Sequence, residues 1–541
     1  MKKIIKYLIG VIVIALVVCG IVVLTRKDPV FPRRVSSNPD AVFYVEAKDE
    51  NGNIYYINLD CVNENGVYVN TLYLPGNTSQ DCFLLWDNKE IFVICGEEEM
   101  KSGKIEIPGV DEILTLLVTV DGEDREYLIK TFVSSENVEP LFIDIDENEG
   151  TISDMNSDPK HDTSCYGHVF FDNEEYIISI KGRGNTTWRD GPKKPYNITF
   201  LEEEYSGKKK VSMIEGTETS KWSLLANYGD PSLLRNRIGY SIANKLSVGL
   251  PTRYFDIWMN GEYLGNYLVT PKNDYQASDE GFILEIDNTI DEEDPQFIIY
   301  NDNGVIDSLL FTVKNDDGEY GVDEIQRITQ VAWDAIEYYN SEIYQDYIDI
   351  ESWAKVYLLN ELYKNYDIVN GSIYMYRDSK ESGKLKAGPI WDLDNSLGIS
   401  SFNLMLNQEI DSPLTKDGWY INSIALDGNN YCWFQELAKH KSFLDEVKKV
   451  YKDNEIYFLE VEQELQTEYD SNIKSSLSDF NKWGNQRSFN NYLIKESKNV
   501  GQEENKIEYI ATNNYDDYYA NLCSYALNRL EYINNNIEDI R

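Results

Sequence analysis

The spacing of apolar residues changes along this chain, and the change limits the folds open to it. From about Ala41 to Val133, short runs such as A-V-F-Y-V-E-A and I-F-V-I-C alternate apolar and polar residues, and Gly, Asn and Asp separate the runs. Alternation with a period of two, broken repeatedly by turn residues, is typical of an all-β sandwich. We therefore predict an immunoglobulin-like β-sandwich over residues 41–135, in which no cluster of catalytic residue types occurs.

From residue 140 onward the pattern becomes mixed. The stretch Y-F-D-I-W-M-N-G-E-Y-L-G-N-Y predicts two strands joined at Asn260-Gly261, a pair that favours a two-residue type I′ turn. Helical spacing follows over Val322–Asn340 and Glu351–Lys364, and long amphipathic stretches predict an all-helical end beyond residue 400. The sequence thus predicts an α+β domain over residues 140–541, of which residues 400–541 are mostly helical.

The N-terminus carries an apolar run from Tyr7 to Thr25 between basic residues. Such a run is long enough to cross a hydrocarbon core as a helix. A cleaved signal peptide would end in a small-residue A-x-A site, and none occurs here. We therefore predict an uncleaved signal anchor over residues 1–27 and a linker over 28–40. The protein is then a single-pass cell-membrane protein with its bulk outside the cytoplasm, and cleavage with secretion is the less favoured alternative.

The chain is strongly acidic, with 93 Asp and Glu against 50 Lys and Arg and a formal net charge of −43. This charge repels phosphate backbones, so it argues against nucleic-acid binding and favours basic protein partners. The chain has 3 His and lacks a C-x-x-C pair, so a zinc site is not expected. Cys61, Cys82 and Cys95 lie close in sequence and are able to pair outside the cell, with the pairing left open.

Acidic residues gather on both sides of a predicted hairpin between Asn365 and Gly398. Asp367 and Asn370 precede the hairpin, and Asp392 and Asp394 follow it. Carboxylate and amide oxygens meeting at one strand end are typical ligands of a divalent cation such as Mg²⁺. The alternative is that these residues only cap turns at the surface. Bulky apolar neighbours of Asp392 in the sequence, P-I-W, favour the metal site.

Cationic candidates for phosphate binding come from two other motifs. The turn G-R-G contains Arg183, and K-K-P-Y contains Lys194. Backbone amides and these cations are able to hold phosphates, although a plain hairpin is the more favoured explanation of the glycines. Arg235 lies on a helix predicted to begin at Asp230 or Ser232 and to end at Leu246. It is a candidate phosphate or carboxylate contact, or a solvated arginine.

Several motifs in one order resemble the CotH family, the spore-coat-protein-H-like atypical protein kinases. They are K-G-R-G-N-T-T-W, K-K-P-Y, W-S-L-L-A-N-Y-G-D-P-S-L-L-R-N, N-G-E-Y-L-G-N-Y, I-L-E-I-D and G-P-I-W-D-L-D. The resemblance implies a divergent kinase fold that uses ATP with Mg²⁺ or Mn²⁺ and phosphorylates Ser or Thr of a protein, here a basic and Ser-rich one.

The same resemblance implies roles for individual residues. Asp367 matches the catalytic aspartate that orients the acceptor hydroxyl. Asp392 matches the metal-binding aspartate of the W-D-x-D motif. Its neighbour Asp394, and Asn370 where a second ligand fits, are the further metal candidates. The residues implied in nucleotide binding are Arg183, Lys194, Arg235 and Glu285.

One position departs from the family pattern. Where many members have a glutamate after N-G-E-Y-x-G-x-Y, this chain has Pro271. Two hypotheses therefore stand side by side. In the first, the chain is a membrane-anchored kinase, which the acids at 367, 392 and 394 favour. In the second, it is a catalytically inactive surface or assembly module on a β-sandwich stalk, which Pro271 favours.

Overall fold

The computed structural model describes most of the chain, and its described residues form two compact units. These residues are 28–78, 82–276, 281–286, 295–300, 309–314, 320–338, 341–365, 368, 371–378, 383–399, 416–421, 433–484, 492–498 and 505–540. The first unit contains residues up to 144 together with 168–175 and 256–264, and the second contains 145–167, 176–255 and the residues from 265 onward.

The predicted anchor over residues 1–27 lies outside the described residues. No described helix is both long enough and apolar enough to cross a membrane. The anchor therefore stays a prediction. Residues 28–40, predicted as a linker, are held against the first unit: Pro29 forms a β-bridge with Ile54, and the Arg34 guanidinium forms two hydrogen bonds of 2.8 Å with the Asp144 carboxylate.

Two β-sheets form the first unit. The four-stranded sheet has the order β2 (Ile54–Asn58), β1 (Tyr44–Lys48), β5 (Phe83–Leu85), β8 (Ile105–Glu106). The six-stranded sheet has the order β3 (Asp60–Glu64), β4 (Val67–Leu74), β10 (Glu123–Val133), β9 (Leu114–Val120), β6 (Phe92–Cys95), β7 (Glu98–Met100). Alternate residues of both sheets, such as Val45, Ile57 and Val118, share one buried core. The β-rich N-terminal region that the alternating pattern predicts is confirmed. Its cysteines at 61, 82 and 95 are free thiols.

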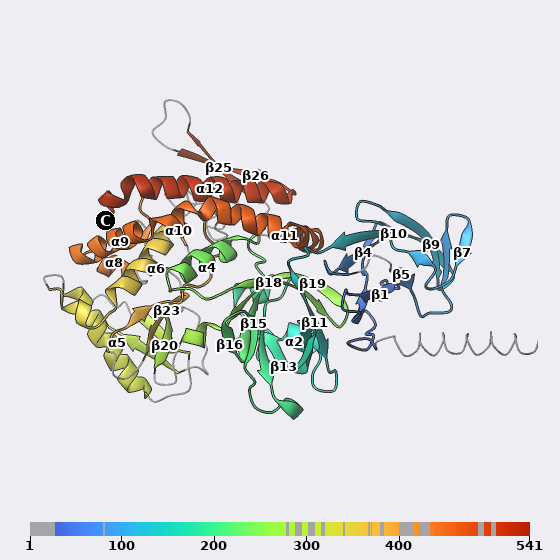
Figure 1. The fold of residues 1–541 in the computed structure, drawn as a ribbon, viewed down its shortest axis with the longest axis horizontal. Helices are drawn as coiled ribbons and strands as arrows, with labels where there is room; N and C mark the ends of the chain where they lie inside the picture. Colours follow the sequence, from blue (N-terminus) through green and yellow to red (C-terminus); the bar gives the residue numbers. More distant parts are fainter. Residues whose placement is uncertain are drawn as a thin grey trace, which may run out of the picture. The chain divides into compact units, whose positions relative to one another are not determined.

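Seven strands then close into a barrel (Figure 1). Their order is β11 (Glu139–Ile145), β12 (Ser164–Phe171), β13 (Glu174–Gly182), β14 (Tyr196–Leu201), β17 (Lys221–Leu225), β19 (Glu262–Pro271), β18 (Arg253–Met259). The turn between β18 and β19 has φ values of 50° at Asn260 and 81° at Gly261, so the predicted two-residue turn is confirmed. Short elements decorate the barrel: α2 (Ile152–Ser157), α3 (Thr186–Asp190), η1 (Glu203–Tyr205), β15 (Val211–Ile214) and β16 (Thr217–Thr219).

A separate five-stranded sheet contains the predicted hairpin. Its order is β21 (Gln296–Ile299), β22 (Leu309–Val313), β20 (Phe282–Ile286), β23 (Ile373–Arg377), β24 (Lys386–Ala387). In the hairpin, Met375 pairs with Ala387 and Tyr376 with Lys386, as the sequence pattern predicts. The 3-10 helices η2 (Asn273–Gln276) and η3 (Ile343–Asp346) and the helices α5 (Val322–Glu337) and α6 (Ile350–Tyr363) complete this part.

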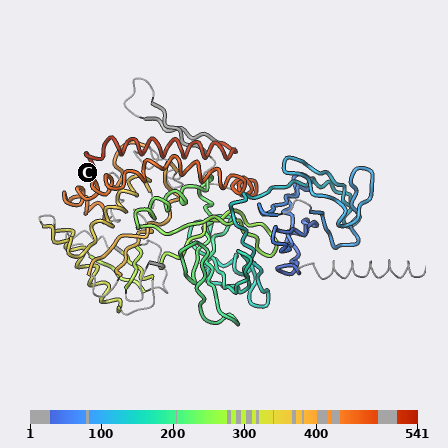
Figure 2. Tube along the Cα trace, in the orientation of Figure 1, coloured from blue at the N-terminus to red at the C-terminus, as the bar shows by residue number. Residues whose placement is uncertain are grey.

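The C-terminal part is mostly helical, as predicted. Its helices are α8 (Trp433–Leu437), α9 (Lys441–Asp453), α10 (Glu455–Leu459), α11 (Val461–Trp483), α12 (Tyr515–Asn536) and the 3-10 turn η7 (Ile537–Asp539). The expectation of an all-helical end is wrong in one place, because β25 (Tyr492–Lys498) and β26 (Asn505–Ala511) form an antiparallel hairpin. Figure 2 shows α11 and α12 running side by side along the second unit.

Candidate functional site

Helix α4 (Arg235–Lys245) is the platform on which the W-D-L-D segment rests. The Asn236 side-chain oxygen accepts a 2.8 Å hydrogen bond from the Leu393 backbone N–H. The Tyr240 hydroxyl accepts a 3.3 Å hydrogen bond from the Asp392 backbone N–H. A Cβ added at Gly239 would overlap the Leu393 side chain, so the glycine allows the close approach. These helix residues are three and four positions apart, and therefore lie on one face of α4.

Arg235 holds the segment from its other side. Its guanidinium, which is 1% exposed, forms an ion pair with Asp230 and donates hydrogen bonds to the backbone carbonyls of Ser396 (3.0 Å) and Leu397 (3.3 Å). The helix begins at Arg235 rather than at the predicted cap, because the Asp230 carboxylate accepts the Arg235 backbone N–H across an intervening turn. The structure thus gives Arg235 a positioning role, and its predicted contact with nucleotide stays a prediction.

The two acids of the segment lie together at the end of this platform. Asp392 has a φ of 52° and accepts a 3.1 Å hydrogen bond from the Ser372 hydroxyl at the start of the β23–β24 hairpin. Burial, followed by the negative charges of Asp392 and Asp230, raises the pKa of Asp394 to about 7. A buried carboxylate whose pKa is raised by a neighbouring carboxylate is part of a site that a cation stabilises.

This donor set fits a magnesium–nucleotide complex. Among the described residues, no three His, Cys, Asp or Glu side chains are grouped so as to hold a metal ion by themselves. Mg²⁺ bound with a nucleotide needs only one or two protein carboxylates, since phosphate oxygens and water complete its coordination. Asp392 and Asp394 supply that number.

Arg183 lies close to the same acids, and its predicted contact with nucleotide stays a prediction. Its guanidinium carbon lies 5.5 Å from the centre of the Trp391 ring, and its charge lowers the pKa of Asp394 against the larger effect of burial. It follows β13, where its backbone N–H donates to the Pro195 carbonyl at 3.2 Å. The structure therefore brings Arg183, Asp392 and Asp394 into one site.

Glu285 is connected to this site through Tyr374. The Tyr374 hydroxyl donates to the Glu285 carboxylate and accepts a 2.6 Å hydrogen bond from the Asn273 side chain. The Tyr374 ring packs edge-on against Trp391, with ring centres 6.3 Å apart. Lys314 lies 2.9 Å from the other Glu285 oxygen. Glu285 thus borders the acidic site without belonging to its carboxylate pair.

Lys194 lies in a different setting. Its ammonium group donates to the backbone carbonyl of Trp188, lies 5.2 Å from that ring centre, and has its pKa lowered mainly by burial. The neighbouring Lys193 is fully buried against Asp479, with a 2.6 Å hydrogen bond to the Asn266 carbonyl. Lys193 is therefore part of the core, while the predicted phosphate contact at Lys194 stays a prediction.

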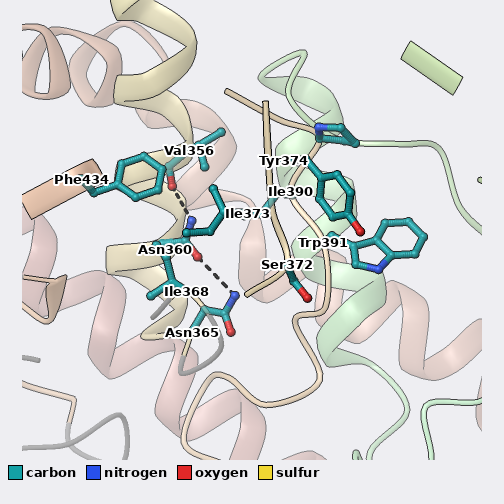
Figure 3. Close-up of a pocket in the computed structure, with 11 residues that line it drawn as sticks. Val356, Asn360, Asn365, Ile368, Ser372, Ile373, Tyr374, Ile390, Trp391 and Phe434 are labelled. Carbon is teal, nitrogen blue, oxygen red and sulfur yellow. Dashed lines mark hydrogen bonds between the residues drawn. The ribbon is translucent and has the colours of Figure 1, made fainter. Parts of the chain in front are cut away.

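Asp367 and Asn370 lie outside the described residues, so their predicted roles stay predictions. A small cavity of about 10 Å³, the room of one water molecule, lies between α6 and the hairpin (Figure 3). Figure 3 shows Asn360 and Asn365 joined by a 3.3 Å hydrogen bond on one side of the hairpin, and Tyr374 with Trp391 on the other.

A comparison with known protein families shows the family of this chain. A family model described as CotH kinase protein matches residues 178–533, which is most of the chain. The chain belongs to the CotH kinase family. No curated protein matches it. The CotH match contains every described residue of the site above, from Arg183 to Asp394.

Sequence reasoning missed the residues of this CotH site that position the acids. Asn236, Gly239 and Tyr240 lie more than 150 positions before the segment they hold, so only the fold brings them together. The signal that was present is the family motif around Arg235, which the structure explains as support for W-D-L-D.

Proposed function

We propose that this CotH-family chain is an atypical protein kinase that transfers the γ-phosphate of ATP to Ser or Thr of a protein. The observation that supports the proposal most is the adjacent pair Asp392 and Asp394, held on α4 with Arg183 opposite. Paired carboxylates beside a cation, on backbone fixed from both sides, suit the binding of a metal-bound phosphate group.

In the proposed reaction, Asp392 and Asp394 hold Mg²⁺ or Mn²⁺. When bound, the cation would neutralise part of the negative charge of the phosphates. Arg183 adds a fixed positive charge on the same side, and the packed rings of Trp391 and Tyr374 exclude water from one wall of the site. These residues therefore position the phosphates rather than react with them.

Asp367 is the proposed base. The oxygen of the acceptor Ser or Thr forms a bond to the γ-phosphorus while the bond from that phosphorus to the β-γ bridging oxygen breaks. The hydroxyl proton passes to the Asp367 carboxylate, and ADP leaves with the bridging oxygen. Asn370 is proposed as a further metal ligand. Both residues keep the roles that the family resemblance implies.

The proposed protein substrate is basic and Ser-rich, because the net charge of −43 attracts such a partner. The proposed location is the cell membrane, through the apolar run at residues 7–25, with the site outside the cytoplasm or at the spore coat. In the sequence, most of the β-rich first unit lies between this apolar run and the residues that match the CotH family.

Pro271 supports a second candidate, a catalytically inactive surface or assembly module. Pro271 ends β19, where it pairs with Trp222, so no carboxylate projects from this position. In the proposed kinase, Glu285 supplies a carboxylate near the site from a different strand. An inactive module needs no such replacement, and the two candidates differ in whether ATP is consumed.

The test is transfer of label from γ-labelled ATP to serine in a basic protein mixture such as histones, using the full-length protein in mild detergent. Transfer that needs Mg²⁺ or Mn²⁺, disappears in Asp392→Asn and persists in Asp111→Asn, an exposed aspartate of the first unit, supports the kinase. Label transfer that is absent, or equal in Asp392→Asn, contradicts it and favours the inactive module.

A further inference from the structure

Four lysines gather beside the acidic site, and the sequence patterns did not point to them. Lys181 is on β13, Lys221 begins β17, Lys272 follows β19 and Lys314 follows β22. We call these residues the lysine cluster. The chain has 93 acidic and 50 basic residues. A group of four neighbouring lysines is therefore not expected from its composition.

The strand register places three of these lysines on one face of the barrel sheet. Lys181 pairs with Asn197, which pairs with Ser223, which pairs with Thr270. Lys221 and Lys272 lie two residues from Ser223 and Thr270, and so they share that face. They are also direct neighbours, because the Lys272 backbone N–H donates to the Lys221 carbonyl at 3.1 Å.

Two carboxylates lie among the lysines and connect them. The Asp274 carboxylate is 3.0 Å from the Lys221 ammonium and 3.6 Å from that of Lys272, and Glu285 is 2.9 Å from Lys314. Of these named groups, positive charge exceeds negative. The cluster is therefore suited to a further negative partner.

The lysine cluster is partly exposed to solvent, unlike the buried ion pairs of the same unit. The side chains of Lys221, Lys272 and Lys314 are 36%, 35% and 23% exposed, so a solute is able to reach them. Burial lowers the pKa of Lys272, and the charges of Lys221, Lys314 and Lys181 lower it further, against the opposing effect of Asp274. Like charges held together at a cost to the folded state are typical of binding sites.

A neighbouring hydroxyl supports the same conclusion. Thr270 is fully buried, and no described residue forms a hydrogen bond with its hydroxyl. It lies on the face shared with Lys272, two residues along the strand. Buried polar groups normally have a partner, and the described residues do not supply one for this hydroxyl.

The lysine cluster adjoins the acidic site through a chain of contacts. Lys314 contacts Glu285, Glu285 accepts the Tyr374 hydroxyl, and the Tyr374 ring packs on Trp391. Arg183 lies two residues from Lys181 on β13 and faces Trp391. The cationic cluster and the two carboxylates therefore border one region.

We propose that Lys181, Lys221, Lys272 and Lys314 bind the phosphate chain of a nucleoside triphosphate whose metal is held by Asp392 and Asp394. The proposal rests on the proposed kinase function and deepens it. It moves the main phosphate contacts from Lys194 and Arg235, which the structure uses elsewhere, to four lysines on the open face. Glu285 and Asp274 then orient the ammonium groups, in the manner of partners to phosphate-binding lysines.

The test is calorimetric titration of the full-length protein with ATP, ADP, AMP and inorganic tripolyphosphate in the presence of Mg²⁺. Lys272→Gln and Lys221→Gln are compared with Lys210→Gln, an exposed lysine of the same barrel region. We expect affinity to rise with the number of phosphates. Each cluster variant should lose about tenfold in ATP affinity, the usual effect of removing a charge-assisted hydrogen bond. AMP binding and Lys210→Gln should remain as in the wild type.

The outcomes separate this proposal from the kinase function. ATP binding that Asp392→Asn removes and the lysine variants leave unchanged overturns the lysine cluster while the kinase function stands. Binding of tripolyphosphate through the lysines without binding of ATP supports the cluster as a polyphosphate site and overturns the kinase function. A wild type that binds neither ATP nor tripolyphosphate overturns both.

Discussion

Arg235 and Lys272 are both cations near the W-D-L-D segment, but their surroundings differ. Arg235 is 1% exposed, pairs with the equally buried Asp230, and donates to two backbone carbonyls. Lys272 is 35% exposed, and three other lysines act on its charge. One cation is enclosed by its partners, and the other is crowded by like charges.

The difference separates support from binding. A buried charge must be matched within the protein, because an unmatched one costs several kcal/mol, about 3–5 when one partner of a pair is removed. Arg529 with Glu361 and Lys193 with Asp479 follow the same rule as Arg235. A partly exposed group of like charges is matched only in part, here by Asp274 and Glu285, and water screens the remaining charge. We therefore assign the enclosed cations to the scaffold and the crowded ones to the site.

The largest predicted effect is that of Arg235→Ala. It leaves Asp230 buried without its partner, and we expect the free energy of unfolding of the second unit to fall by about 3–5 kcal/mol. Chemical denaturation followed by tryptophan fluorescence measures this. The double variant Asp230→Asn/Arg235→Met should recover part of the loss. A loss below about 1 kcal/mol in the single variant would place Arg235 with the site cations instead.

The next effect is that of Gly239→Ala on α4. The new methyl overlaps the side chain of Leu393, which is fully buried. We expect a destabilisation of about 1–3 kcal/mol, typical of overpacking. The change should also weaken Mg²⁺-dependent ATP binding, since Leu393 lies between the two acids. The matched control is Ser241→Ala on the same helix, which removes a 2.9 Å hydrogen bond to Glu464 away from the segment.

A smaller effect concerns Asp394 and pH. Its pKa of about 7 lies above its ordinary value of 3.8, so the folded state binds the proton more tightly than the unfolded chain. Its contribution to stability is present below pH 3.8 and is lost as the pH rises through 7. With divalent cations chelated, Asp394→Asn should therefore become more stable than wild type as the pH rises from 4 to 8, by at least about 1 kcal/mol.

Thermal unfolding at several pH values measures this difference, and Asp111→Asn is the control. Saturating Mg²⁺ should reduce the gain at high pH, because a bound cation favours the ionised carboxylate. A gain that is the same at pH 4 and pH 8 would show that Asp394 does not titrate in this range.

The smallest predicted effect is that of Lys272→Gln on stability. Removing one of several repelling charges should leave the free energy of unfolding unchanged within about 0.5 kcal/mol or raise it slightly. The same denaturation experiment as for Arg235→Ala measures it. A loss near that of Arg235→Ala would show that the lysine cluster belongs to the scaffold.

Much of the fold could be predicted from local patterns. The turn at Asn260-Gly261, the β23–β24 hairpin and helices α5 and α6 follow from residues adjacent in sequence. The β25–β26 hairpin was missed. It interrupts a region whose other segments have helical spacing, and no short turn pair such as Asn-Gly marks it.

Candidate site residues could be identified from the sequence only where they belong to a local motif. Asp392 and Arg183 were identified because carboxylates near a hairpin and an arginine between glycines are local signals. The lysine cluster required the register of β13, β14, β17 and β19, which no local pattern contains. The sequence left Arg235 as a contact to phosphate or to a carboxylate, or as a solvated arginine, because burial cannot be read from an isolated arginine. The structure shows its contact with the Asp230 carboxylate and with two backbone carbonyls.

The most direct test of the account is nucleotide binding by the acidic pair. The melting temperature of the full-length protein is measured with ATP, with and without Mg²⁺, for wild type and Asp392→Asn. We predict that wild type is stabilised only when both are present, by about 2.7 kcal/mol at a hundred times the dissociation constant, and that Asp392→Asn is not. Equal stabilisation of both proteins, or none of wild type at millimolar Mg²⁺–ATP, would contradict the account.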